Sequence, residues 1–144
     1  MNVNRILIAG LLVAMPLVGS ARAESPAEAA GYRSVELPLV AGKGKPIEAR
    51  VVADTPHVKS VVIIMRNGAT LKEHASPHPA SIQALSGQGK VRLGATTKKV
   101  SPTELLLLDP GVKHEVVADA GTDLILLVHH MKGGQGKDAS HHGH

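Results

Sequence analysis

The stretch ELLLLDPGVKHEVVADAGTDLILLV, residues 104–128, contains three short apolar runs separated by two turn sequences. Short runs rich in Val, Ile and Leu favour β-strands. Asp109-Pro110-Gly111 and Asp119-Ala120-Gly121 favour turns, because Pro presets φ and Gly tolerates positive φ. Short strands joined by short turns predict antiparallel β-structure in this part of the chain.

The same pattern continues toward the N-terminus. Around eight runs of this type occur, and no stretch of useful length has a helical period. The sequence therefore predicts an all-β fold, an antiparallel sandwich or barrel, with an aliphatic core because Phe and Trp are absent. The predicted strands are SVELPLV (34–40), IEARVVA (47–53), VKSVVIIM (58–65), SIQAL (81–85), KVRL (90–93), ELLLLD (104–109), HEVVA (114–118) and DLILLV (123–128).

The composition excludes several classes of protein. The 144 residues carry a formal net charge of +4. They include one Tyr and no Phe or Trp. Nucleic-acid binding needs a clustered basic surface or stacking aromatic groups, so we expect no nucleic-acid partner. The absence of Cys excludes disulfides, thiolate metal sites and a cysteine nucleophile.

Residues 1–23, MNVNRILIAGLLVAMPLVGSARA, have the pattern of a secretory signal peptide. A basic residue, Arg5, precedes an apolar run that is too short to span about 30 Å of hydrocarbon, and small residues surround the expected cleavage point. We therefore expect no permanent membrane anchor, a mature chain of 121 residues that starts at Glu24, and a periplasmic or secreted location. An uncleaved membrane tether is the alternative. Residues 24–31 are expected to be a flexible lead-in.

Two segments that contain histidines are informative. Segment 68–89 reads GATLKEHASPHPASIQALSGQG and includes His74 and His78, and His114 follows the turn at Asp109-Pro110-Gly111. Over roughly residues 58–131 this arrangement resembles the small single-domain cupins, the RmlC-like jelly rolls. Their first motif carries His-x-His and then Glu, and their second carries Pro-x-Gly-x-x-His. The resemblance implies an antiparallel double-sheet jelly-roll β-barrel over residues 32–131.

Individual residues of this sequence match positions of the two cupin motifs. His74 stands at the leading histidine of the first motif and His114 at the histidine of the second. Leu85-Ser86-Gly87 matches the turn that follows the first motif, and Gly111 matches the glycine of the second. Cupin resemblance also implies a homodimer as a possible assembly.

Two of the usual four cupin ligands are missing. Ser76 stands where the second histidine is expected, and Ala80 where the glutamate is expected. Alternate residues of an extended segment share a face, so His78 is the best substitute ligand. Pro77 and Pro79 cannot donate ladder hydrogen bonds and could turn this segment into a loop.

Three imidazoles, from His74, His78 and His114, with water at the open positions would suit a divalent transition metal: Zn, Cu, Ni, Fe or Mn. The alternative is a barrel whose histidines only form hydrogen bonds in its interior.

From His129 onward the chain, HHMKGGQGKDASHHGH, is polar and rich in Gly and His. We expect residues 132–144 to be a disordered tail in which His141, His142 and His144 chelate metal weakly. An inert solvated tail and a remnant of an expression tag are the alternatives.

The predicted function is therefore a secreted or periplasmic, cupin-like protein that binds a divalent transition metal, with a tail that captures or buffers the ion. A metal-dependent cupin enzyme, a dioxygenase or isomerase acting on a small molecule, is the alternative from another class. A metal-free barrel that binds a small ligand is the third.

Overall fold

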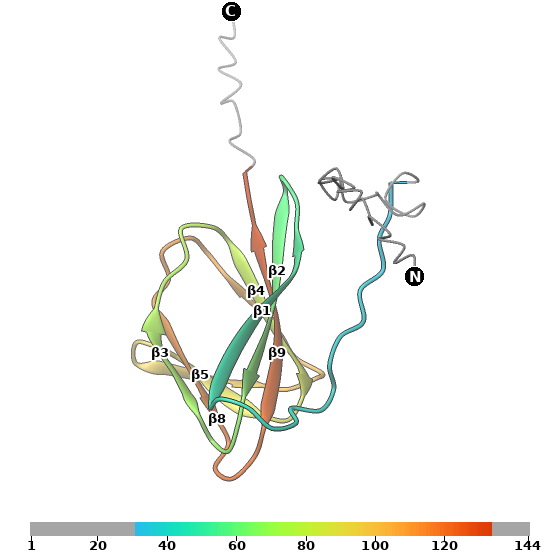
Figure 1. The fold of residues 1–144 in the computed structure, drawn as a ribbon. Helices are drawn as coiled ribbons and strands as arrows, with labels where there is room; N and C mark the ends of the chain where they lie inside the picture. Colours follow the sequence, from blue (N-terminus) through green and yellow to red (C-terminus); the bar gives the residue numbers. More distant parts are fainter. Residues whose placement is uncertain (1–30, 134–144) are drawn as a thin grey trace, which may run out of the picture. The chain divides into compact units, whose positions relative to one another are not determined.

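The computed structural model describes residues 31–133 of the chain. The compact unit that begins at Val35 contains, within the described residues, nine β-strands and no helix (Figure 1). No helix long and apolar enough to cross a membrane occurs in this described part. The strands are β1 (Ile47–Asp54), β2 (Val58–Met65), β3 (Thr70–His74), β4 (Ala80–Ser86), β5 (Gly89–Leu93), β6 (Thr96–Val100), β7 (Leu105–Leu108), β8 (His114–Ala118) and β9 (Leu124–Met131).

The strands form two antiparallel sheets. The larger has the order β1-β2-β9-β4-β7, and the smaller has the order β3-β8-β5-β6. Neighbours in each sheet are mostly distant in sequence, as in a jelly roll, where the chain crosses repeatedly between sheets. The structure confirms the predicted all-β, antiparallel double-sheet fold.

The main core lies between the two sheets. Along β9, the alternate residues Leu124, Leu126 and Val128 are buried in it, together with Val91 of β5 and Val116 of β8. These side chains are aliphatic, as the lack of Phe and Trp requires. Each buried Val, Leu or Ile contributes about 1.5–3 kcal/mol, so an aliphatic core can hold the two sheets together.

A second apolar cluster covers the other face of the larger sheet. Val62, Ile64 and Ile125 point to this face, and Leu37 and Ala41 of the preceding segment pack on them. The prediction of a strand at 34–40 is wrong, since this segment covers the sheet without joining it.

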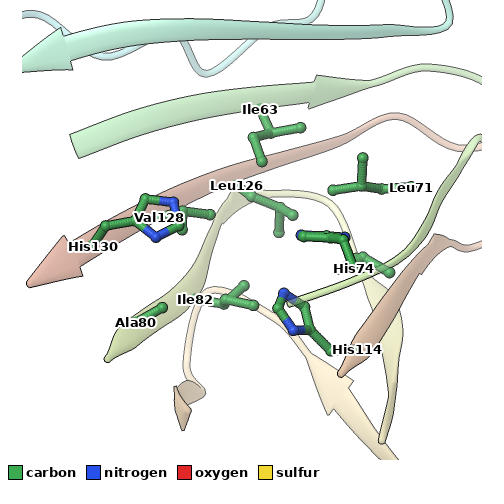
Figure 2. A pocket seen from close by; sticks show the side chains of 10 residues that line it. Ile63, Leu71, His74, Ala80, Ile82, His114, Leu126, Val128 and His130 are labelled. Carbon is green, nitrogen blue, oxygen red and sulfur yellow. The ribbon is translucent and has the colours of Figure 1, made fainter. Parts of the chain in front are cut away.

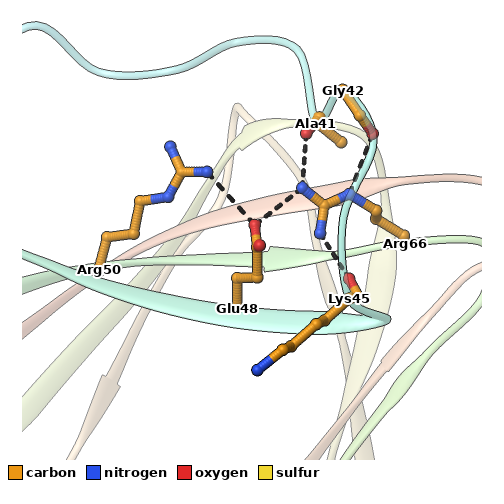
Figure 3. Close-up of polar contacts among 6 residues, drawn as sticks. All are labelled: Ala41, Gly42, Lys45, Glu48, Arg50 and Arg66. Carbon is orange, nitrogen blue, oxygen red and sulfur yellow. Dashed lines mark hydrogen bonds and ion pairs between the residues drawn. The ribbon is translucent and has the colours of Figure 1, made fainter.

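Arg66 holds the same segment in place (Figure 3). Its buried guanidinium donates hydrogen bonds to the carbonyl oxygens of Gly42 (3.0 Å), Lys45 (2.5 Å) and Ala41 (2.7 Å). It also forms an ion pair of 2.8 Å with Glu48. The hydrogen bond and charge of Arg66 lower the pKa of the Glu48 carboxyl, although partial desolvation acts in the opposite direction.

Two strands are absent from the predicted set, and β9 extends well beyond its predicted end. β3 and β6 have polar sequences, TLKEH and TTKKV, without a run of apolar residues. Both are edge strands, which tolerate Thr and Lys because one side faces solvent and charge discourages pairing with other chains. β9 continues to Met131 and so includes His129 and His130, which the sequence analysis grouped with the polar tail.

Candidate functional site

A small cavity opens between the sheets at one end of the barrel (Figure 2). Its volume is about 30 Å³, and its wall consists of seven aliphatic side chains and three histidines, His74, His114 and His130. Figure 2 shows His74 and His114 together at one end of the cavity and His130 at the other. The cavity has room for an ion with a water molecule or two, because a water needs about 10–15 Å³ of such space.

A β-bulge brings His74 to this cavity. His74 ends β3 and lies opposite His114, which begins β8, but the register shifts between Leu71 and His74. Leu71 lines the cavity, so strict alternation would point residue 74 away from it. The extra residue of the bulge turns His74 back to the cavity side. The two rings then lie with centroids 4.3 Å apart and planes tilted by 57°.

Both rings are anchored through the same nitrogen. Nδ1 of His74 lies 2.8 Å from the carbonyl oxygen of Lys72, and Nδ1 of His114 lies 2.9 Å from that of Val112. A carbonyl only accepts hydrogen bonds, so each Nδ1 carries the proton and donates it. In the neutral rings Nε2 is then unprotonated, with a lone pair that can bind a metal. Carbonyl anchoring of this kind orients many metal-binding histidines.

Electrostatics favours the neutral form of His114. Its side chain is only 5% exposed, and burial lowers its pKa below the ordinary value of 6.5. The hydrogen bond to Val112 raises this pKa, and the nearby His74 lowers it again. A neutral imidazole at neutral pH is the form that coordinates metal ions.

His130 is the cavity residue that the sequence analysis missed as a site residue. It follows Leu124, Leu126 and Val128 in the alternation of β9, so it points to the cavity side. Its Nδ1 lies 3.2 Å from Oγ of Ser76. Burial lowers the pKa of His130, and Lys59 is the largest charged contribution in the same direction, followed by His78, His74 and His114. Continuation of the alternation past Val128 was the sequence signal for this placement.

His78 does not line the cavity. The segment between β3 and β4 is a loop, and His78 is exposed in it. The backbone N–H of His78 donates to Oγ of Ser76 (3.1 Å), and the flanking Pro77 and Pro79 cannot donate to a ladder. The structure therefore brings together two histidines of the predicted triad, His74 and His114, and places His78 on the rim.

Comparison with solved structures identifies the architecture. A cupin-superfamily protein from Desulfitobacterium hafniense has a TM-score of 0.59 at 10% identity, over 70% of this chain and 94% of that protein. An RmlC-like cupin from Shewanella frigidimarina has a TM-score of 0.56 at 20% identity, over 64% of this chain and 81% of that one. The chain has the cupin fold.

A third solved structure has a similar fold. A conserved protein with a double-stranded β-helix domain from Klebsiella pneumoniae has a TM-score of 0.58 at 18% identity, over 68% of this chain and 87% of that chain. No protein-family model matches the sequence, and no curated protein sequence is significantly similar to it. At these identities the comparisons establish the cupin fold.

The donor set of this barrel is smaller than a full metal site. Within residues 31–133, no group of three or more His, Asp or Glu side chains is arranged to hold an ion. The ring centroids of His74 and His114 lie 4.3 Å apart, which is close to the separation of roughly 5 Å expected for two imidazoles bound to one ion at about 2.0–2.1 Å. His141, His142 and His144, the predicted tail ligands, lie outside the described residues.

A wider groove adjoins the cavity of the cupin barrel. It has a volume of about 440 Å³ and shares His74 and His130 with the cavity. Its other lining residues are Asp54, Lys59, Ala75, Ser76, Pro77, His78 and Lys132. A molecule in this groove would therefore lie directly beside the paired histidines.

Proposed function

We propose that this protein binds one divalent transition-metal ion at the mouth of its barrel, through Nε2 of His74 and Nε2 of His114. The observation that carries the proposal is the anchored pair of imidazoles. Both rings donate Nδ1–H to a carbonyl of their own chain, and the rings are adjacent. Cupin neighbours in the structure comparison support a metal or small-molecule function in general.

The size of the cavity favours an ion over an organic ligand inside the barrel. Pockets for drug-sized molecules measure about 300–1,000 Å³, roughly ten times the cavity volume or more. An ion with bound water fits the space. Ile82 and Leu126 are among the apolar side chains of its wall.

Imidazole nitrogen suits Zn, Cu, Ni and Fe, and the lack of carboxylate in the donor set makes Mn a weaker candidate. When bound, such an ion would supply Lewis acidity to water or to a substrate oxygen. His74 and His114 would hold the ion, and His130 is the further imidazole on the cavity wall. The open coordination positions and the adjoining groove favour the metal-dependent enzyme as the second candidate function.

Export and the histidine-rich tail belong to the proposal. We expect cleavage before Glu24 and a periplasmic or secreted protein, and we expect His141, His142 and His144 to bind the same type of ion weakly. A tail of this kind would raise the local concentration of metal near the barrel.

Elemental analysis tests the barrel site. The full mature protein carrying His141→Ala, His142→Ala and His144→Ala would be purified without a metal-affinity column, so that tail ions do not contribute. We expect one metal ion per chain, and loss of that ion in the additional variants His114→Ala and His74→Ala.

His57→Ala is the matched control, because His57 is exposed and does not line the cavity. It should retain the ion. Equal metal content in His114→Ala and His57→Ala would refute the assignment of the site.

A further inference from the structure

The groove beside the cavity is lined by basic side chains and by the loop between β3 and β4, which hydrogen bonds hold in place. Lys59, Lys132 and the histidines at positions 74, 78 and 130 all line it. Asp54 is the one acidic residue in the described lining. Its carboxylate forms an ion pair with Nζ of Lys132, which also donates to the carbonyl oxygen of Thr55 (3.1 Å).

Lys59 has no direct partner in the described part of the chain. Its ammonium forms no hydrogen bond or ion pair with any residue between 31 and 133, although Asp54, opposite it in the β1–β2 register, feels its charge. Because Asp54 is already paired with Lys132, the positive charge of Lys59 is not neutralised within the groove. An uncompensated ammonium at the edge of a partly enclosed groove attracts anions.

The strand register places His130 beside Lys59. Lys59 of β2 lies directly opposite His130 of β9, and both residues line the groove. An anion between the two side chains would form an ion pair with Lys59 and would accept a hydrogen bond from an N–H of the neutral His130 ring.

The opposite wall is held in place before any ligand binds. The carbonyl oxygen of Ser76 accepts a hydrogen bond from the N–H of Gly111 (2.8 Å), and that of Pro79 accepts one from Met131 (2.9 Å). Oγ of Ser76 bonds to the N–H of His78 and contacts His130. A wall that is already ordered reduces the entropy lost when a ligand binds.

We propose that this groove binds a small organic anion, a molecule with a carboxylate or phosphate group, and that Lys59 makes the principal charge contact. The volume of about 440 Å³ fits a small molecule. With its anionic group on Lys59, the molecule would extend along the groove toward His74. The basic groove is formed by the protein alone, so anion binding does not require the metal ion. The inference rests on the proposed function only in placing a metal ion next to the bound anion.

The test measures binding of succinate and of inorganic phosphate, with neutral succinamide as the uncharged probe. The full mature chain would be freed of metal on a chelating resin that is then removed, so that no soluble chelator competes as an anion. We expect succinate or phosphate to bind by calorimetry, to shift the amide resonances of residues near Lys59 and His78, and to bind more weakly as salt increases. We expect succinamide not to bind.

Lys59→Gln should weaken the binding about tenfold or more, as expected for loss of a charged contact. Lys59→Arg should retain binding within a few-fold. Lys90→Gln is the matched control, because it removes the same charge from an exposed position on β5 in the other sheet. Amide spectra of each variant would verify the fold.

The results for the metal-free protein and for Lys59→Gln distinguish an anion bound by the groove from an anion bound by the metal ion. Anion binding by metal-free protein that requires Lys59 supports the groove, whether or not the barrel binds metal. Binding that appears only after metal is added, and that Lys59→Gln leaves unchanged, makes the anion a metal ligand and overturns the groove while leaving the metal site intact. No binding of either anion, or equal weakening by Lys59→Gln and Lys90→Gln, also overturns it.

Discussion

His74 and His114 face each other across the β3–β8 ladder, and each ring is held by the carbonyl of the residue two positions earlier in the chain. The two anchors leave Nε2 of both rings free. The ring centroids lie 4.3 Å apart, and both residues line the same cavity. Neither property is required for packing alone, because an aliphatic residue at either position would extend the apolar wall.

Metal should stabilise the folded protein. An ion that binds only the native state raises the free energy of unfolding by about 2.7 kcal/mol at a free concentration of 100 times Kd. With the three tail histidines replaced by Ala, Zn²⁺ should therefore raise the Tm by several degrees. The increase should vanish in His114→Ala, which differential scanning calorimetry would show. The same increase in His114→Ala would place the stabilising ion elsewhere.

Stability of the metal-free protein should fall in mild acid. Burial holds the pKa of His114 below 6.5 in the folded state, so the unfolded chain binds more protons as pH decreases through 6.5. The stability that depends on neutral His114 is fully present above that pH and is lost as pH falls toward the lower, folded pKa. His130 acts in the same direction.

Urea denaturation at pH 7.5 and pH 5.5 would measure this loss. His114→Gln cannot be protonated in this range, so the difference between the two pH values should be smaller than in the wild type. An unchanged difference would show that other groups control the pH dependence.

Much of the fold, and part of the site, could be predicted from the sequence. The run Val58–Met65 is a strand with the predicted bounds, because its apolar residues from 61 to 65 serve both the barrel core and the covered outer face. The pairing of His74 with His114 followed from the cupin resemblance. Sequence alternation could not show it, because a bulge sets the direction of His74.

There is a physical reason why His130 lines the cavity and the predicted His78 does not. Local composition made the chain from His129 onward look like a tail, but β2 and β4 flank this segment and pair with it as far as Met131 and His130. Such long-range pairing leaves no local signature. In the resulting register His129 points to the outer face, where its Nδ1 lies 2.8 Å from Oγ of Ser60, and His130 points to the cavity.

Removal of the Arg66 side chain should release the segment around residues 41–45. Arg66→Ala would leave three backbone carbonyls without their donor, and we expect a destabilisation of about 2–4 kcal/mol. Arg50→Ala is the control, because Arg50 is exposed and contacts only Glu48 in Figure 3. Chemical denaturation should show little change for Arg50→Ala, and comparable losses in the two variants would contradict the role of Arg66.

Gly87 should tolerate no side chain. Its φ is +81°, and a Cβ there would collide with the carbonyl oxygen of Asp123. Gly87→Ala should therefore cost more than the about 1–2 kcal/mol expected for left-handed backbone alone. Gly121→Ala isolates that backbone cost, since Gly121 has a φ of +70° and open space around it. Equal unfolding free energies for the two variants would show that the turn at Gly87 adjusts freely.

Binding of one metal ion by Nε2 of His74 and Nε2 of His114 can be observed in a crystal structure of the Zn²⁺-loaded protein, with anomalous data collected on both sides of the zinc absorption edge. We expect one anomalous peak in the barrel cavity, about 2.0–2.1 Å from both nitrogens. A fully loaded crystal with zinc only on the tail or on His78, and none between these two rings, would refute the shared site.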